Sequence, residues 1–269
     1  MIYAEIIYFY TKKQQILLTA RVYNCSMAKK IYMTSFKGGT GVTTCCIGLG
    51  LALAESGERT LIVDGDTKSG NAMLIANLRN MQVYTLADYE RGACRAKQTI
   101  LTHPKTGNLC FMPSLNLKDL SAAAKAVTDV DGLFDYILLD KIAIEVCDSA
   151  FIVTEPFLPS VKSADCCRSA LADGGIKDIG LVVNKINGGQ ILSGDIMTAQ
   201  EIATVLHTPL KAVIPEDLTL CAGKWRQSTL KAFGIAAQTV TGKKESFCNV
   251  LKGYAGMSGY FKRKMREKI

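Results

Sequence analysis

A glycine-rich stretch, SFKGGTGVTT at residues 35–44, has the composition best suited to chemistry in this sequence. It lies between an apolar run at 31–35 and a helical pattern at 43–55. Glycines allow successive backbone N–H groups to curl around an anion, and the N-terminus of a helix adds a positive dipole. The order of strand, glycine turn and helix therefore predicts a phosphate-binding loop. A tight strand-to-helix turn without a ligand is the alternative.

This loop resembles the deviant Walker A motif of the MinD/ParA family of P-loop ATPases, which runs Gly-Lys-Gly-Gly-x-Gly-Lys-Thr-Thr. Lys37 matches the early lysine, which in the family acts catalytically across an ATP-sandwiched dimer, and Thr43 matches the magnesium-ligand hydroxyl. Phe36 replaces the first glycine, and Val42 replaces the P-loop lysine, which neutralises phosphate charge. We therefore expect weakened nucleotide binding and weak or absent hydrolysis. The loop positions assigned to the nucleotide are Lys37, Gly38, Gly39, Thr40, Gly41, Val42, Thr43 and Thr44.

The resemblance continues over roughly residues 30–269 and is greater to the MinD branch of the family than to ParA. The segment LIVDGD resembles the switch I strand, which implies that Asp66 orients the attacking water and that Asp64 lies near the magnesium ion. The segment FDYILLD resembles the Walker B strand and implies that Asp140 is an outer carboxylate of the magnesium site. Carboxylates that merely cap a strand end are the alternative for Asp64 and Asp66.

Two later segments, VVNK at 182–185 and IPED at 214–217, resemble the MinD segments that line the adenine. They imply that Asn184 and Pro215 contact the base. A carboxamide can both donate to and accept from a base edge, although a turn residue at a strand end is the alternative for Asn184.

After Asp140 the family continues with a Pro, a Gly and a helix, whereas this chain reads KIAIEVC. The shortened switch II implies that coupling to the γ-phosphate is compromised.

Apolar runs of strand length alternate with helical patterns along the chain. Strands buried on both faces and separated by helices predict an α/β fold with a doubly wound, mostly parallel sheet and helices on both faces. One domain at 27–257 is expected, because no linker interrupts it. The expected strands are 31–35, 60–64, 108–113, 136–140, 150–154, 179–184 and 210–215. The expected helices are 43–55, 86–93, 117–127, 161–172 and 198–207, with further helical segments closing the chain.

The net charge of +8 is concentrated at the two ends of the chain. Residues 1–26 carry a net charge of +2 and residues 258–269 a net charge of +4, so the body carries only +2. A body with so little net charge does not have the basic surface expected of a nucleic-acid-binding protein, and we expect no specific nucleic-acid partner.

Residues 1–26 do not resemble a secretion signal. Because Met27 leads directly into a strand, we treat 1–26 as an N-terminal appendage and hypothesise a mis-called start.

Neither the cysteines nor the apolar runs indicate a metal site or a membrane span. The ten cysteines include no CxxC pair, so zinc, iron–sulfur and disulfide frameworks are not indicated. The metal-insertion and reductase ATPases of the same superfamily would need such a pattern. The longest uncharged apolar run, 45–54, is about half of what a membrane-spanning helix needs. An integral membrane protein is therefore excluded.

The C-terminal segment 258–269 reads as a basic amphipathic tail. Phe261, Met265 and Ile269 fall on one stripe of a helix, with basic residues on both sides. This pattern is typical of a helix in a membrane interface, and it resembles the membrane-targeting end of MinD proteins. A solvated basic tail is the alternative. We expect attachment to an anionic membrane surface.

The resemblance implies a cytoplasmic protein that lies peripherally at the inner face of the cell membrane. This interpretation has two alternatives. ATP and Mg²⁺ are its expected cofactors, and an ATP-dependent homodimer its expected assembly. A division-inhibitor or topological-specificity protein is the expected partner, in the placement of the cell-division site. A non-catalytic P-loop scaffold or dimer partner is the first alternative, favoured by Val42 and the broken switch II. A ParA-like chromosome or plasmid partition ATPase is the second, and the near-neutral body disfavours it.

Overall fold

The computed structural model describes residues 27–68, 71–76, 78, 84–142, 145–222 and 224–252. The predicted appendage at 1–26 and the predicted tail at 258–269 lie outside the described residues, and both stay predictions. Among the helices that are described, none has the length and apolarity needed to cross a membrane.

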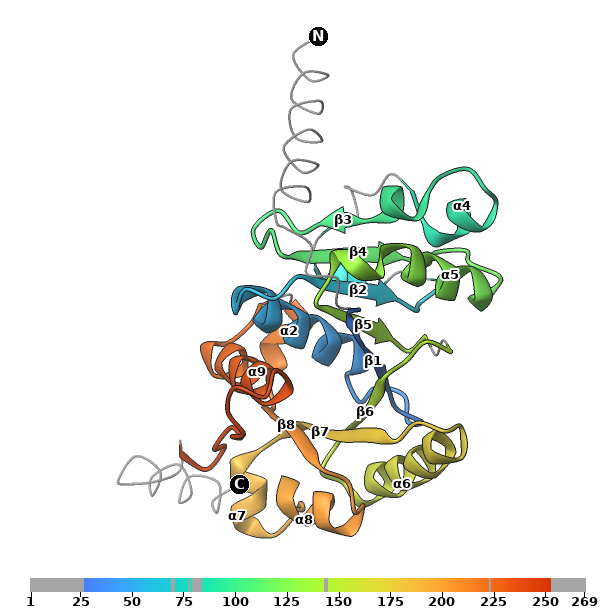
Figure 1. Cartoon of the computed structure of the whole chain (residues 1–269). Coiled ribbons are helices and arrows are strands. Elements are labelled where there is room, and N and C mark those ends of the chain that lie inside the picture. The colour runs from blue at the N-terminus through green and yellow to red at the C-terminus, as the bar shows by residue number, and fades with distance from the viewer. Residues whose placement is uncertain are drawn as a thin grey trace.

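The described chain forms one eight-stranded sheet in the order β3-β4-β2-β5-β1-β6-β7-β8 (Figure 1). Every neighbouring pair is parallel except β3 and β4, which are antiparallel. The strands are β1 (Lys29–Thr34), β2 (Thr60–Asp64), β3 (Leu101–Thr102), β4 (Leu109–Pro113), β5 (Tyr136–Asp140), β6 (Ser149–Thr154), β7 (Asp178–Ile186) and β8 (Leu210–Pro215). The predicted mostly parallel sheet is confirmed.

Helices cover both faces of this sheet, which is why its strands are apolar on both sides. In β1, Ile31 and Met33 pack in the same core cluster as α2 (Val42–Glu55) and α9 (Gln227–Val240). Tyr32, between them, packs against the cluster on the opposite face. That face is covered by α4 (Leu86–Glu90) and α5 (Leu120–Val130) beside β2, β4 and β5, and by α6 (Leu158–Asp173) and α8 (Ala199–Val205) beside β6, β7 and β8. The doubly wound architecture therefore agrees with the prediction.

Helix ends differ from the predicted bounds where side chains or glycines set them. The helix predicted at 117–127 begins three residues later, because the carboxylate of Asp119 accepts the N–H of Ser121 and caps the N-terminus. The helix predicted at 86–93 ends at Glu90, shortly before Gly92 with its left-handed φ of 74°. The helix predicted at 161–172 begins earlier, with Pro159 in its first turn. Several short elements were not predicted. They include α3 (Asn71–Ile75), α7 (Gly188–Ser193), β3 and the 3-10 helices η1 (Ala96–Thr99) and η2 (Asp131–Leu133).

The connection from β5 to β6 is short. It runs over residues 141–148, and no helix is formed by its described residues, which are 141–142 and 145–148. Ile142, Val146 and Cys147 pack against the cluster that holds α4 and α5. The chain therefore passes from β5 over β1 to β6 along that face, and the described part of the connection lacks the helix that usually makes such a crossover.

Candidate functional site

The glycine-rich loop connects the carboxyl end of β1 to α2, at the edge where ligands bind to parallel sheets. Gly39 and Gly41 have left-handed φ values of 81° and 91°, which only glycine adopts freely. A Cβ on Gly41 would also collide with the amide of Asn184. No acidic side chain lies in the first turn of α2, and Gly41 provides no side-chain cap. The first N–H groups of this 14-residue helix are therefore available to an anion.

Two side chains at the end of β7 brace this loop from outside. Asn184 Nδ2 donates to the carbonyl oxygen of Thr40 at 2.8 Å, and Lys185 Nζ donates to that of Gly39 at 2.6 Å. A trans peptide directs its C=O and the following N–H to opposite sides. Holding these carbonyls outward therefore turns the N–H groups of Thr40 and Gly41 toward the inside of the loop, as an anion cradle requires.

An ion cluster lies beside the loop and joins three strands. Glu155, just after β6, accepts from Lys37 Nζ at 2.9 Å and from Lys185 Nζ at 2.7 Å. Ser160 Oγ donates to the same carboxylate at 3.3 Å. The Glu155 side chain is 12% exposed, whereas Lys37 and Lys185 are 39% and 42% exposed. Burial raises the pKa of Glu155, but the hydrogen bonds and charges of the two lysines bring that pKa below its ordinary value. Both ammonium groups thus gather at the loop.

The side chain of Val42 is 4% exposed, as buried as its neighbours Thr40 and Thr43, and it packs in the core cluster that holds α9 and β1. It offers a phosphate only its backbone N–H. The cation that a P-loop usually places at this position is replaced by an apolar contact.

Buried oxygens lie immediately below the loop. Thr43 Oγ1 and both carboxylate oxygens of Asp140 are buried without a regular hydrogen-bond partner in the described part of the chain. Burial raises the pKa of Asp140 to about 6, while Lys141 and the hydroxyl of Thr43 lower it. Thr43 is therefore close enough to act on Asp140 without meeting regular hydrogen-bond geometry. Buried oxygens normally find a partner, so this pair is suited to a ligand.

The two carboxylates at the end of β2, Asp64 in the strand and Asp66 after it, have hydrogen-bond partners that the carboxylate of Asp140 does not have in the described residues. Asp64 is register partner of Asp140 across β2 and β5, and it accepts the N–H groups of Asp66 at 3.0 Å and Ala72 at 3.2 Å. Burial raises the pKa of Asp64, and these backbone bonds oppose the rise. Asp66 accepts the N–H of Lys68 at 3.1 Å. The capping role considered for both residues is therefore present, and both still lie close enough to raise the pKa of Asp140.

These residues fit a magnesium ion of the kind that accompanies a nucleotide. No cluster of three or more potential metal-ligating side chains forms among the residues that the structure describes. Mg²⁺ at phosphates keeps most of its waters and needs only one or two protein oxygens. The unpartnered hydroxyl of Thr43 and the unpartnered carboxylate of Asp140 provide such oxygens.

The predicted base-contacting residues lie at the ends of adjacent strands. Asn184 is near the end of β7, and Pro215 is the last residue of β8, in register with Ile186. The structure thus brings Asn184 to the loop, which it contacts, and leaves Pro215 at the neighbouring strand end. Glu155 was not predicted as a site residue, and Lys185 was given no role of its own although it lies in the VVNK segment predicted to line the adenine. Glu155 follows a parallel strand next to the loop, and that position was the available signal.

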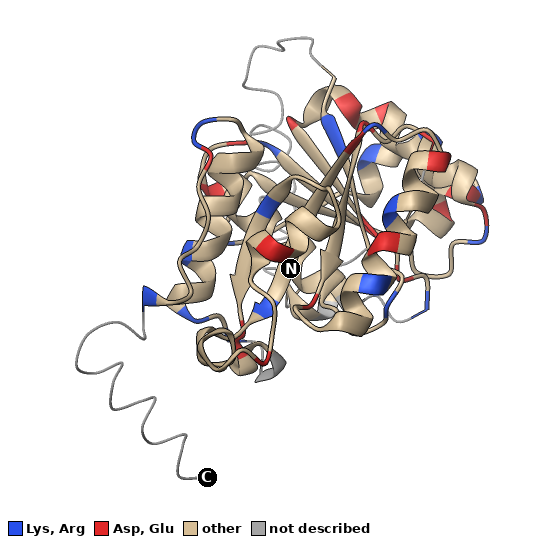
Figure 2. Cartoon of the chain, turned by 90° about the horizontal axis from the view of Figure 1, so that it is seen from below, with Lys and Arg blue, Asp and Glu red and all other residues tan. Residues whose placement is uncertain are grey.

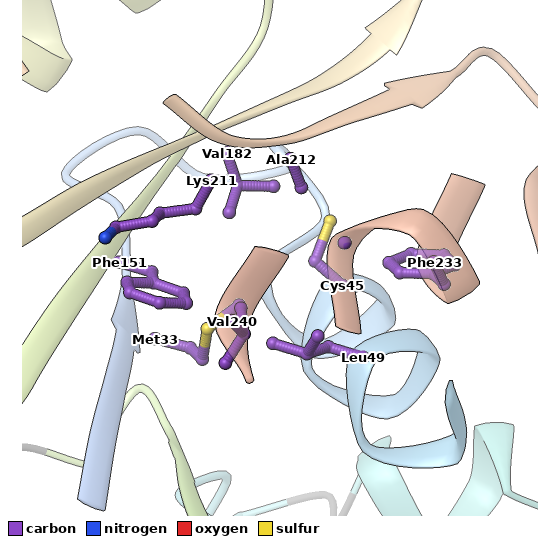
Figure 3. A pocket seen from close by; sticks show the side chains of 10 residues that line it. Met33, Cys45, Leu49, Phe151, Val182, Lys211, Ala212, Phe233 and Val240 are labelled. Atoms are coloured by element: carbon purple, nitrogen blue, oxygen red, sulfur yellow. The ribbon is translucent and has the colours of Figure 1, made fainter. Parts of the chain in front are cut away.

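Elsewhere, a small cavity lies inside the core between α2, α9 and the sheet (Figure 3). Its volume of about 10 Å³ holds one water at most. Apolar side chains such as Cys45 and Phe233 line it, together with Lys211, whose Nζ lies 5.9 Å from the ring centroid of Phe151. It is a packing defect and not a substrate site.

The loop, the strand-end carboxylates and the parallel sheet define a P-loop nucleotide-binding domain. The chain belongs to the CobQ/CobB/MinD/ParA nucleotide-binding domain family, whose model matches residues 31–229. It is 31% identical over 207 residues to the septum site-determining protein MinD of Bacillus subtilis, covering 71% of this chain and 77% of that protein. The MinD cell division protein of Aquifex aeolicus is similar in structure, with a TM-score of 0.74 and 25% identity over 82% of this chain and 100% of that chain. A chain of the MinC:MinD cell division complex of the same organism has a TM-score of 0.75 and 25% identity, over 81% of this chain and 98% of that one.

Proposed function

We propose that this MinD-like nucleotide-binding protein binds ATP with Mg²⁺ through residues 37–44, dimerises on binding, and hydrolyses ATP weakly or not at all. The observation that carries the proposal is the braced loop. Its glycines adopt the conformation of an anion cradle, and β7 holds two of its carbonyls outward. The side chain at the usual lysine position, Val42, is meanwhile buried in the core.

The chain's own residues divide the binding between them. Backbone N–H groups from Gly38 to Thr44 hold the phosphates, Asn184 and Pro215 face the base, and Asp66 orients a water. Thr43 and Asp140 would hold the magnesium ion, Asp64 lies beside them, and the ion would neutralise phosphate charge. The unpartnered oxygens of Thr43 and Asp140 support this assignment.

Two features support weak hydrolysis. Val42 provides no charge for the β- and γ-phosphates. The connection at 141–148 is short and has no helix in its described residues, so little of it can move when a γ-phosphate binds. The same features support the alternative of a non-catalytic scaffold that binds nucleotide without a switch.

The proposal also covers how the protein assembles and where it is located. Lys37 is partly exposed at the loop, which allows it to reach the phosphates of a second copy in an ATP-dependent homodimer. A similar structure is a complex of the cell division proteins MinC and MinD. It supports a proposal that this chain also has a protein partner, for which we propose the division inhibitor or topological-specificity protein expected from the family resemblance. The predicted tail at 258–269 would attach the dimer to an anionic membrane, which two tails bind more tightly than one.

In Figure 2, basic and acidic residues are interspersed over the elements in view, which does not favour the DNA-binding alternative.

Nucleotide affinity and turnover test the first part of the proposal. ATP binding measured by calorimetry should be detectable with magnesium, and phosphate release should be slow or absent. Light scattering should give a dimer with ATP and a monomer without it. Binding without dimerisation would favour the scaffold, and no binding of ATP would overturn the proposal.

Sedimentation with liposomes or DNA tests the second part. The full chain should sediment with anionic liposomes, more with ATP and less at high salt. A variant that lacks 258–269 should stay in solution and remain folded. Sedimentation with DNA and not with liposomes would favour the partition ATPase.

A further inference from the structure

Lys141 lies at the same edge of the sheet as the glycine loop, but on the other side of β1 from Glu155. It follows β5, which lies between β1 and β2 in the sheet (Figure 1). Its backbone N–H donates to the carbonyl oxygen of Met33 in β1 at 2.9 Å. Gly65, just after β2, lies so close to Asp140 that a Cβ would collide with the carbonyl oxygen of that residue. The backbone at Lys141 is therefore fixed between β2 and the strand that leads into the loop.

The side chain of Lys141 is exposed, and its ammonium group makes no ion pair with any residue that the structure describes. Lys37 and Lys185, also at this edge, differ because they share the carboxylate of Glu155. An anion that binds Lys141 therefore has no carboxylate to displace.

The backbone conformation of Lys141 takes its side chain out of the alternation of β5. Successive side chains of a strand point to opposite faces, so a continued strand would direct Lys141 away from the face that holds Asp140. Its φ of 56° is left-handed, and the chain turns here instead. The positive charge of Lys141 lowers the pKa of Asp140 and that of Cys46 in α2, although burial keeps both pKa values above the ordinary ones. The ammonium group thus lies toward α2.

The region between α2 and the end of β5 also holds the unpartnered oxygens of Thr43 and Asp140. These oxygens are the ones proposed above for a magnesium ion. Lys141 is therefore on the side of the loop where the ion and the phosphates would meet, whereas Glu155 and its two lysines are on the other side.

We infer that Lys141 binds a terminal phosphate group of the nucleotide and supplies the charge that Val42 does not provide. The inference rests on the nucleotide binding proposed above. The carboxylates of Asp64, Asp66 and Asp140 lie at the ends of β2 and β5, and their like charges would repel a polyphosphate. A cation beside them reduces this repulsion, as the usual P-loop lysine does. Lysine side chains are long and flexible and donate three hydrogen bonds from one charged group.

Calorimetry with ATP, inorganic triphosphate and adenosine, each with magnesium and with EDTA, tests the inference. Lys141→Met should weaken the binding of ATP and of triphosphate about tenfold, the value of one charge-assisted contact, and leave adenosine unchanged. Wild type should retain measurable triphosphate binding in EDTA, and the loss in Lys141→Met should persist there, because the contact is made to the phosphate and not through the ion. Lys141→Arg keeps the charge and should retain most of the affinity.

Two further variants control the test. Lys177→Met is the matched control, since Lys177 is exposed just before β7, at the opposite edge of the sheet. It should bind all three ligands like wild type. Lys141→Asn removes the same charge with a residue that tolerates a left-handed φ, so it decides the test if the methionine variant does not fold.

Unchanged triphosphate binding in Lys141→Met, an equal loss for adenosine, or an equal loss in Lys141→Arg would overturn the inference. A loss that is present with magnesium and absent in EDTA would also overturn it, because Lys141 would then act only through Asp140 and the ion. So would a wild type that binds triphosphate only with magnesium. A wild type that binds triphosphate but not ATP would overturn the proposed function and leave Lys141 as a polyphosphate contact. A wild type that binds neither would overturn both.

Discussion

The connection from β1 to β2 and the connection from β5 to β6 leave the same edge of the sheet but differ in construction. The first contains the glycine loop and the 14-residue helix α2, and β7 braces it through two hydrogen bonds. The second spans residues 141–148 without a helix in the part that is described. The proposed function assigns nucleotide binding to the first connection and the response to a γ-phosphate to the second. On that proposal, binding can persist where the response is reduced.

The conformation of the glycine loop depends little on the shorter connection. Its conformation comes from its own glycines and from Asn184 and Lys185, which lie on β7. The shorter connection contacts the rest of the sheet through the carboxylate of Asp148, which accepts the N–H of Lys30 at 2.7 Å, and through backbone bonds. Lys141 N donates to Met33 O, and Gly65 N donates to Asp140 O, both at 2.9 Å. This separation leads to four predictions, beginning with the largest effect.

Gly65→Ala should disrupt the start of the short connection. A Cβ at this position would collide with the carbonyl oxygen of Asp140 and with Ile142, and backbone atoms cannot move aside as a flexible side chain does. We expect a loss of about 3 kcal/mol in the free energy of unfolding, the upper end for overpacking. Urea denaturation measures it. Gly132→Ala, where a Cβ meets nothing within 4 Å, is the control, and equal stabilities would contradict the packing described here.

Asp140→Asn should stabilise the nucleotide-free protein at neutral pH. The folded pKa of Asp140 is about 6, against 3.8 ordinarily, chiefly because of burial. Between pH 4 and 6 the folded state therefore holds a proton that the unfolded state has lost, and stability falls as pH rises through this window. The ionised carboxylate costs about 2–3 kcal/mol above pH 6, and nothing below pH 4.

Denaturation at pH 7.5 and at pH 4 with and without the substitution checks this expectation. Asp140→Asn should be more stable than wild type at pH 7.5 and similar to it at pH 4. The same variant should lose the magnesium dependence of ATP binding if Asp140 holds the ion. A destabilised variant at pH 7.5 would show that Asp140 has partners that compensate its burial.

The sequence predicted features whose residues are close together along the chain and missed those whose residues are far apart. The bounds of β2, β5 and β8 match the predicted strands, because each is an apolar run ended by a turn or by Asp or Pro. The loop was recognisable from its own glycines. The Glu155 cluster was not, because its residues are 118 and 30 positions apart and meet only when β1, β6 and β7 lie side by side. The two-residue β3 and the short α3 and α7 are too brief for a periodic signal.

Lys37→Ala should abolish ATP-dependent dimerisation and leave the monomer folded. The lysine is partly exposed, and its ion pair with Glu155 contributes little to stability for that reason. Light scattering with and without ATP measures the dimer. Lys162→Ala, at an exposed position of α6, is the control. A normal dimer in Lys37→Ala would assign this lysine to solvent or to the bound nucleotide of its own chain.

Val42→Lys in the otherwise unchanged protein has the smallest expected effect and separates the two connections most directly. A lysine in the first turn of α2 can keep its aliphatic stem against the core and place its ammonium at the phosphates. ATP affinity should rise about tenfold, the value of one charge-assisted contact. Phosphate release should stay as slow as in wild type, because the substitution leaves the short connection at 141–148 as it is. Calorimetry and a phosphate-release assay on the same preparation measure both quantities. A rate that rises together with affinity would mean that the missing charge alone limits turnover, and that hydrolysis here does not depend on a helix after β5.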